Sequence, residues 1–191
     1  MTPELELANR TALPDPLRVL IKEFPREQWK TNPNYSQLIA FWLDRHLMFR
    51  RLMGQLNDDL EQVMDRNMDP DNYKRSLSRF GGMLINQLHG HHQIEDAQYF
   101  PVMAKLDKRV SHGFDLLDSD HHAMDGLLAG LAGGANDVLQ FDPGKKAKFK
   151  DRLGDLHGIL DSFGTMLDRH LIDEEELVVP VLLKYDPEQL R

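Results

Sequence analysis

Apolar residues recur every three or four positions along most of this chain, a spacing that is typical of amphipathic α-helices. Prolines interrupt the pattern, because a proline inside a helix removes a hydrogen bond and clashes with the preceding turn. Five of the ten prolines fall in the first 33 residues, and the segments MDPDN and FDPGK carry strong turn chemistry. The pattern therefore predicts four helices, over Tyr35–Asn67, Asn72–Leu106, Val110–Gln140 and Lys145–Leu183.

Four amphipathic helices joined by short turns most simply form an all-α fold, an antiparallel up-down-up-down four-helix bundle. We assign residues 35–185 to this bundle, residues 1–34 to an irregular N-terminal arm and residues 186–191 to a C-terminal tail. Within the arm, one short amphipathic turn is expected around Leu17, Leu20 and Ile21.

Each predicted helix carries a histidine in the middle of its apolar stripe, and in two helices a glutamate follows that histidine by one turn. The histidines are His46, His91, His121 and His170, and the glutamates are Glu95 and Glu174. Because His46 and His91 are almost equally far from the turn at Asp69, antiparallel packing places them at one height. One shared site on the inside of the bundle is therefore expected.

The two histidine and glutamate pairs belong to a repeated motif, HHQIEDAQYFP and HLIDEEELVVP, in which a proline also recurs at the same distance. Four residues of α-helix turn by about 400° and rise about 6 Å, so the histidine and the glutamate project from one face. An isolated pair of this kind is most simply a solvated surface pair. Glu95 and Glu174 instead lie on apolar stripes, where an uncompensated carboxylate costs on the order of several kcal/mol. Two buried glutamates require cations, which predicts a metal site.

The absence of cysteine from all 191 residues excludes disulfides, cysteine-ligated zinc, iron–sulfur clusters and cysteine nucleophiles. Four imidazoles and two carboxylates suit iron, and less specifically zinc, manganese or copper. Six ligands are too many for one structural zinc, which is normally four-coordinate. They fit two metal ions that share the carboxylates, with positions open for a bridging oxygen, a peroxide or a diatomic gas.

The charge balance limits the partners of the chain. It has 23 Lys+Arg against 31 Asp+Glu, a net charge of −8, and no long basic stretch, which disfavours nucleic acid and anionic membrane surfaces. The first residues lack the layout of a signal peptide, and no apolar run approaches the roughly 18 residues of a membrane span. We expect a cytoplasmic monomer or homodimer whose partner is a small molecule.

Four segments resemble the hemerythrin-like, or HHE cation-binding, family: LDRHLMFRRL, HHQIEDAQYFP, DSDHHAMDGLL and HLIDEEELVVP. The resemblance covers roughly residues 35–185. It implies an antiparallel four-helix bundle that holds a non-haem di-iron centre, with two iron ions of the Fe–O–Fe type as cofactor. It also implies the ligands His46, His91, Glu95, His121, His170 and Glu174, with the two glutamates as bridges.

The chain departs from the oxygen-carrying members of that family at two positions. Asp125 stands where those members have a second histidine on the third helix, and Glu175 stands where they have the carboxylate of the fourth. One imidazole fewer makes the site more carboxylate-like than an oxygen carrier. The alternate ligands are His92, Asp96, His122, Asp125 and Glu175. The core residues expected to wall a dry pocket are Trp42, Phe49, Phe80, Met124, Phe163 and Met166.

Three functions fit this interpretation. The first is a di-iron module that binds O2, NO or peroxide for storage, sensing or the handling of iron and oxidants. The second is a di-iron enzyme that consumes peroxide, NO or ferrous iron, using Lewis-acid and redox chemistry. The third is a bundle in which the metal, whether iron, zinc or manganese, only stabilises the fold.

Overall fold

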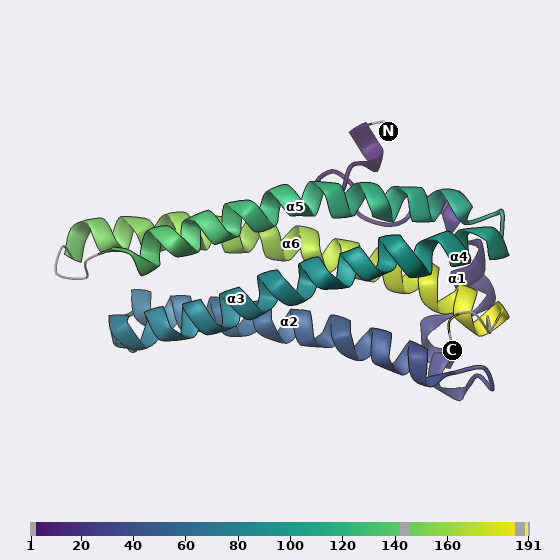
Figure 1. Ribbon diagram of the computed structural model, residues 1–191, viewed down its shortest axis with the longest axis horizontal. Helices are drawn as coiled ribbons and strands as arrows, with labels where there is room; N and C mark the ends of the chain where they lie inside the picture. The colour runs from purple at the N-terminus through teal and green to yellow at the C-terminus, as the bar shows by residue number, and fades with distance from the viewer. Residues whose placement is uncertain (1–2, 142–145, 186–189, 191) are drawn as a thin grey trace. The chain divides into compact units, whose positions relative to one another are not determined.

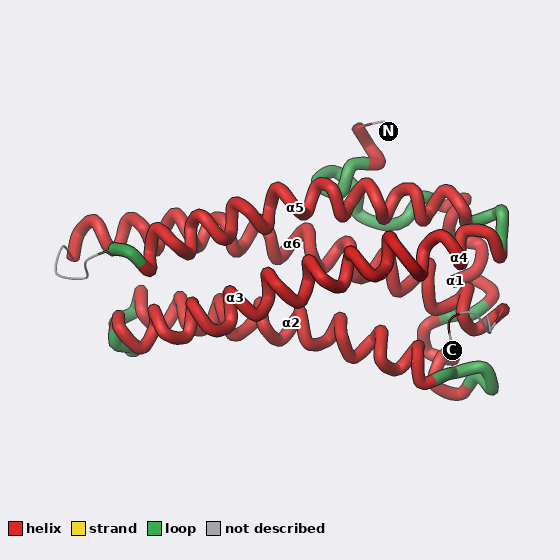
Figure 2. Tube along the Cα trace, in the orientation of Figure 1, coloured by secondary structure: helices red, strands yellow, loops and turns green. Residues whose placement is uncertain are grey.

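Helices and loops make up all of the chain that the computed structural model describes, namely residues 3–141, 146–185 and 190 (Figure 1, Figure 2). The α-helices are α1 (Val19–Glu23), α2 (Gln37–Met64), α3 (Pro70–Ile94), α4 (Phe100–Leu106), α5 (Ser111–Leu139) and α6 (Lys146–Tyr185). Short helical turns are η1 (Pro3–Leu5), η2 (Asp15–Leu17), η3 (Arg26–Thr31) and η4 (Glu95–Tyr99). The predicted all-α class is confirmed, and the arrangement is consistent with a helical bundle. Apart from Leu190, the expected tail over residues 186–191 lies outside the described residues.

The predicted turn around MDPDN is present between α2 and α3. Arg66 adopts a left-handed backbone conformation, with φ at 64°, which ends the helical path of α2. Asp69 caps α3, because its Oδ2 accepts the backbone N–H groups of Asp71 and Asn72, both at 3.1 Å. Pro70 occupies the first position of α3, where no N–H is needed.

The predicted helix Asn72–Leu106 is not a continuous α-helix, because the turn η4 is π-helical. Phe100 donates its N–H to the carbonyl of Glu95, five residues back. Pro101 follows directly in the first turn of α4, where a missing N–H is tolerated. π-Turns occur frequently at functional sites, and this one begins at a predicted ligand.

The chain divides into two compact units, and the four long helices contribute segments to both. Unit 1 comprises Met1–Leu47, His91–Ala123 and Met166–Arg191, and unit 2 comprises Met48–Gly90 and Met124–Thr165. All six ligands predicted from the sequence belong to unit 1. None of the described helices combines the length and the apolar character that a membrane span requires.

The core of unit 1 includes the N-terminal residues that the sequence predicts as an irregular arm. Leu20, on the short helix α1, is 1% exposed, and Leu13 and Trp29 are buried in the same cluster. The prolines prevent a long helix, but short helical turns still deliver apolar side chains to the core. In the same unit Gly113 of α5 lies so near α6 that an added Cβ would be 2.7 Å from Leu177.

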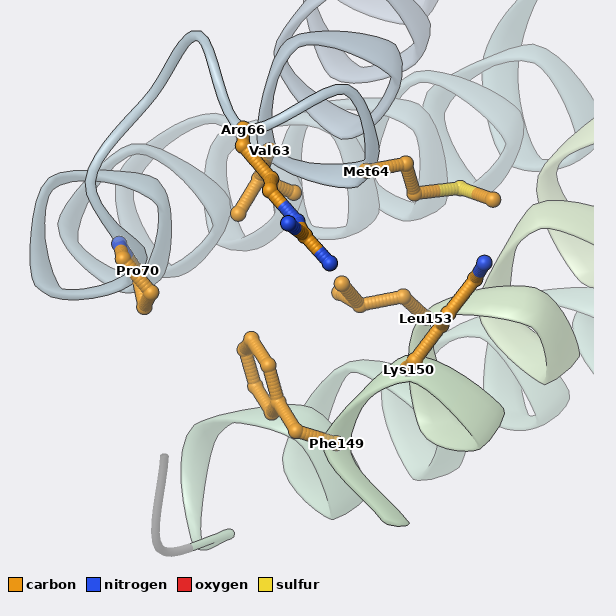
Figure 3. A pocket seen from close by; sticks show the side chains of 7 residues that line it. All are labelled: Val63, Met64, Arg66, Pro70, Phe149, Lys150 and Leu153. Atoms are coloured by element: carbon orange, nitrogen blue, oxygen red, sulfur yellow. The ribbon is translucent and has the colours of Figure 1, made fainter. Parts of the chain in front are cut away.

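Unit 2 contains a cavity of about 400 Å³ (Figure 3). Five apolar side chains line it together with Arg66 and Lys150. Because no histidine or carboxylate is among these lining residues, the cavity does not have the donor set of the predicted metal site.

Candidate metal centre

Seven buried or nearly buried side chains of unit 1 form two groups. Within each group, the potential ligand atoms all lie within 4.8 Å of one another. The two-histidine group is His46, His91, Glu95 and Glu174, and the three-histidine group is His92, His121 and His170. Helices α2, α3, α5 and α6 and the turn η4 all contribute, which brings together residues far apart in the sequence. The structure therefore places all six predicted ligands, together with His92, in one cluster.

Glu174 of α6 belongs to the two-histidine group, and one of its oxygens also faces the three-histidine group. Its Oε1 lies 3.3 Å from Nε2 of His46, and its Oε2 lies 3.4 Å from Nε2 of His170. The indole N–H of Trp42 donates to Oε1, which fixes the orientation of the carboxylate. A carboxylate with one oxygen toward each group can bridge two cations.

Glu95, the first residue of the π-turn, has the same double orientation. Its Oε1 lies 2.9 Å from Nε2 of His91, and its Oε2 lies 3.6 Å from Nε2 of His121. Both carboxylates are fully buried, at 1% exposure or less. Together with Glu174, Glu95 gives the cluster two carboxylates that each connect the two groups.

Three of the five histidines are oriented by carboxylates on the side of the ring that faces away from the glutamates. The Nδ1 atoms of His46, His121 and His170 donate to Glu175 at 3.0 Å, Asp96 at 2.8 Å and Asp120 at 3.4 Å, respectively. An ionised carboxylate only accepts hydrogen bonds, so Nδ1 of each ring carries a proton and Nε2 is the atom that faces Glu95 or Glu174. Metal-binding histidines are typically held in this way.

Several buried polar atoms of the cluster have no hydrogen-bond partner within the part of the chain that the structure describes. They are both ring nitrogens of His92, both carboxylate oxygens of Glu95, Nε2 of His121, Nε2 of His170 and Oε2 of Glu174. Each such atom costs about 1 to 3 kcal/mol if it stays unsatisfied. A cation in each group would bind the carboxylate oxygens and one ring nitrogen of each histidine, which leaves the second ring nitrogen of His92 as the exception, so the residues fit a metal centre.

The two buried glutamates have opposite pKa shifts. Burial and the charge of Glu174 raise the pKa of Glu95 well above its usual value. Burial also acts against ionisation of Glu174, but the nearby rings of His46 and His170 outweigh it and hold its pKa well below the usual value. A cation between the glutamates would favour the ionised form of both.

The histidine pKa values are also spread apart by their surroundings. Burial lowers the pKa of His91 to about 3 and lowers that of His92 well below its usual value. For His170, burial is outweighed by the carboxylates of Asp120 and Glu174, which raise its pKa to about 9. His91 and His92 are therefore neutral at physiological pH and able to act as ligands.

His92 is the main difference between the expected and the observed cluster. The sequence keeps it only as an alternate, because the repeat of His170, Glu174 and Pro180 matches His91 rather than His92, which lies about 100° further round the helix. In the structure His91 lies against His46, with their Nε2 atoms 3.2 Å apart, while His92 stacks on His121 with ring centroids 3.9 Å apart. A helix with neighbours on two sides can direct adjacent residues to different partners, so α3 contributes two histidines.

The other alternates take different places. Glu175 and Asp96 bind the far nitrogens of histidine rings and belong to neither group. His122 is exposed, with Nδ1 donating to the carbonyl of Asp118, and Asp125 is exposed beside His89. The structure does not bring His122 or Asp125 to the cluster.

Aromatic rings pack against two histidines of the cluster. Trp42 lies in unit 1, edge-on to His91 with ring centroids 5.9 Å apart, and Met166 is half-buried in the same unit. Phe49, Phe80, Met124 and Phe163, which the sequence also predicts to line the pocket, belong to unit 2. The ring of Phe100 stacks on His121, with centroids 5.4 Å apart.

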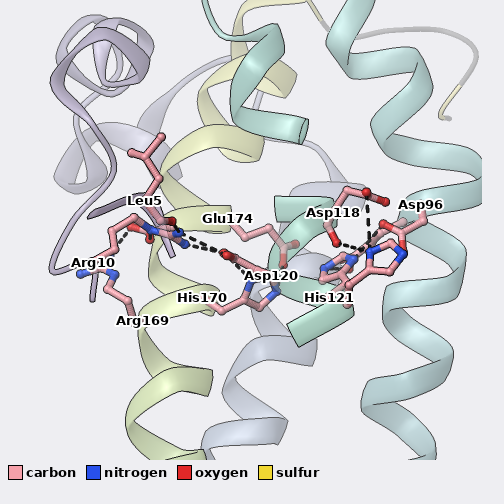
Figure 4. A network of polar contacts seen from close by, with 12 residues as sticks. Leu5, Arg10, Asp96, Asp118, Asp120, His121, Arg169, His170 and Glu174 are labelled. Carbon is pink, nitrogen blue, oxygen red and sulfur yellow. Dashed lines mark hydrogen bonds and ion pairs between the residues drawn. The ribbon is translucent and has the colours of Figure 1, made fainter. Parts of the chain in front are cut away.

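Three polar residues around the cluster, Arg10, Asp120 and Asp173, were not predicted from the sequence. Arg10 from the N-terminal segment reaches Asp120 of α5 and Asp173 of α6, and all three are buried (Figure 4). The one available signal is the run of acidic residues in IDEEEL, which is usually a solvated face. Here Asp173, Glu174 and Glu175 are all buried, so α6 needs cationic partners on several sides.

Comparison with known families agrees with this geometry. The model of the hemerythrin HHE cation-binding domain matches residues 37–182. The chain belongs to this family. Searches of curated proteins and of solved structures found no match. All seven residues of the two groups fall inside the region that matches the hemerythrin HHE domain, whereas Arg10 precedes it.

Proposed function

We propose that the protein binds two iron ions in unit 1 and uses them to bind a small ligand such as O2, NO or peroxide. The observation that carries the proposal is the orientation of the two glutamates, each with one oxygen toward each group. One ion would be held by His46 and His91 and the other by His92, His121 and His170, with Glu95 and Glu174 shared. The unpartnered ring nitrogens and carboxylate oxygens support this assignment.

The donor set favours iron. It consists of nitrogen and oxygen atoms only, since the chain has no cysteine, and imidazole with carboxylate suits iron. Five histidines and two carboxylates exceed what a four-coordinate structural zinc requires. When bound, iron would supply Lewis-acid and redox chemistry.

With both glutamates shared, the two-histidine group supplies two further imidazoles and the three-histidine group supplies three. A small ligand would therefore enter on the two-histidine side, which has one protein donor fewer. Trp42 packs there against His91 and holds Glu174 by its indole N–H, which excludes water and fixes the carboxylate. We also propose the antiparallel up-down-up-down order for the four long helices, because short connections favour it.

Metal analysis combined with visible spectra during anaerobic reduction and re-oxygenation tests the proposal. The expected result is two iron ions per chain and a visible band that is lost on reduction and returns with O2, NO or peroxide. A purified protein that takes up no iron, or whose iron responds to none of these ligands, contradicts it. Sustained consumption of peroxide, NO or ferrous iron would identify the same centre as an enzyme.

A further inference from the structure

The N-terminal segment, defined here as residues 3–34, directs two arginines toward the metal centre. Arg10 lies between η1 and η2, and Arg26 opens η3. Both precede residues 37–182, the region that matches the family, so the family match assigns them no role. Each arginine pairs with a carboxylate that in turn binds a histidine of the cluster.

Arg10 is held by two acidic residues at once. Its Nε donates to Asp173 at 2.7 Å, and both terminal nitrogens donate to Asp120 in a fork, one of them at 3.1 Å (Figure 4). Asp120 also accepts from Nδ1 of His170 at 3.4 Å. Because the side chains of Arg10 and Asp120 are each 2% exposed, this connection is shielded from solvent. A continuous path therefore runs from the N-terminal segment to the three-histidine group.

Arg26 forms an equivalent path to the two-histidine group. It donates to Oε2 of Glu175 at 2.5 Å, and Oε1 of the same carboxylate accepts from Nδ1 of His46 at 3.0 Å. The guanidinium also lies over the ring of Trp29, 4.7 Å from its centroid, which steadies it. Glu175 is buried, but Arg26 is 46% exposed.

The third carboxylate and histidine pair lacks this support. Asp96 accepts from Nδ1 of His121 at 2.8 Å, and no arginine or lysine is paired with it among the described residues. Since an arginine stays charged at all physiological pH values, it keeps its carboxylate partner ionised and fixed in a fork geometry. The ionised carboxylate in turn sets the orientation and the basicity of the imidazole.

We propose that the N-terminal segment is a working part of the metal centre, in which Arg10 and Arg26 are positioning residues that act on His170 and His46 through Asp120 and Glu175. The inference rests on the proposed function where iron binding is measured, but it does not rest on it where the histidine rings of the metal-free protein are measured. Docking of the segment thereby sets the metal affinity and the spectrum of the centre.

The test compares full-length variants Arg10→Gln, Arg10→Lys and Arg26→Gln with the matched control Arg18→Gln. Arg18 belongs to the same segment and pairs with Glu176 of α6 at 3.8 Å, but Glu176 is not paired with a histidine of the cluster. The first measurement is iron retention against a chelator, together with the visible spectrum of the loaded protein. We expect Arg10→Gln to weaken iron binding about tenfold or more, with a smaller loss for Arg26→Gln and none for Arg18→Gln.

The second measurement is nitrogen NMR of the histidine rings in the metal-free protein. Arg10→Gln should shift the Nδ1 signal of His170 and leave that of His121 unchanged, whereas Arg26→Gln should shift that of His46. If Arg10→Gln does not fold, Arg10→Lys retains the charge without the fork and should give an intermediate shift and an intermediate loss of iron.

The outcomes separate the two proposals. If the wild-type chain binds no iron but the ring signals respond as expected, the proposed function fails and the positioning role stands. If iron retention, the spectrum and the ring signals of the folded Arg10 and Arg26 variants all match those of Arg18→Gln, the positioning role is overturned.

Discussion

Each side of the metal centre is connected to the N-terminal segment by an arginine that pairs with a carboxylate, which in turn binds a histidine. The two connections differ in their exposure to solvent. On the three-histidine side, Arg10 and its partner Asp120 are each 2% exposed. On the two-histidine side, Arg26 is 46% exposed, although Glu175 is buried. A buried charge that loses its partner costs about 3 to 5 kcal/mol, whereas an exposed pair contributes about 0 to 1 kcal/mol. The three-histidine side is therefore held more firmly than the two-histidine side. The two-histidine side is the one at which we propose that a small ligand enters.

His92→Phe removes the histidine that makes the groups unequal, and it should have the largest effect on metal binding. We expect iron affinity at the three-histidine group to fall more than about 100-fold, since losing a ligand exceeds the loss of an outer hydrogen bond. The metal-free protein should become more stable by about 1 kcal/mol, because two unpartnered buried nitrogens disappear. Chelator competition and urea unfolding measure the two effects, with exposed His122→Phe as the control. Unchanged iron affinity would contradict the assignment of His92.

Arg10→Met tests the buried side of the comparison in the metal-free protein. It leaves Asp120 buried without its guanidinium, while Asp173 keeps Arg169 at 2.5 Å. The free energy of unfolding should fall by about 3 to 5 kcal/mol, measured by urea denaturation. If the free energy of unfolding fell by less than about 1 kcal/mol, the buried ion pair of Arg10 would contribute no more to stability than an exposed pair does.

Arg26→Met is the matching change on the exposed side. Arg26 is 46% exposed, but the change leaves the buried Glu175 without its guanidinium, so the free energy of unfolding should fall by about 1 to 3 kcal/mol, less than for Arg10→Met. The same urea titration measures it. A loss equal to that of Arg10→Met would remove the distinction between the two sides.

Arg18→Gln should have the smallest effect of the series. Its pair with Glu176 is partly exposed and long, at 3.8 Å, so a change within about 0.5 kcal/mol is expected in thermal or urea unfolding. A larger loss would show that the whole segment, rather than the two paths, determines stability.

Local periodicity was sufficient to predict the long helices, and it identified six residues that the structure brings into one cluster, while the family was predicted from the resemblance of four segments to its members. Periodicity could not place His92, since a single stripe per helix excludes the neighbour of His91, and adjacent residues meet different helices only in the folded chain. The π-turn at Glu95 also lies beyond such a pattern, because the repeated motif has a proline at the same distance in α6, at Pro180, and α6 remains α-helical there.

The N-terminal segment could not be positioned from the sequence for a different reason. Arg10 and Asp120 are 110 residues apart, and a contact of that range leaves no periodic signal in the chain. Short helical turns between prolines have too few residues to show a stripe, so the burial of Leu13, Leu20 and Trp29 became evident only in three dimensions.

The central claim is that Glu95 and Glu174 connect two separate metal ions. The direct test is an anaerobic titration of the metal-free, full-length protein with ferrous iron, in which calorimetry measures the heat of binding. We expect saturation at two equivalents per chain in the wild type and fewer than two for Glu174→Ala. Saturation of the wild type at one equivalent, or two full equivalents retained by Glu174→Ala, would contradict it.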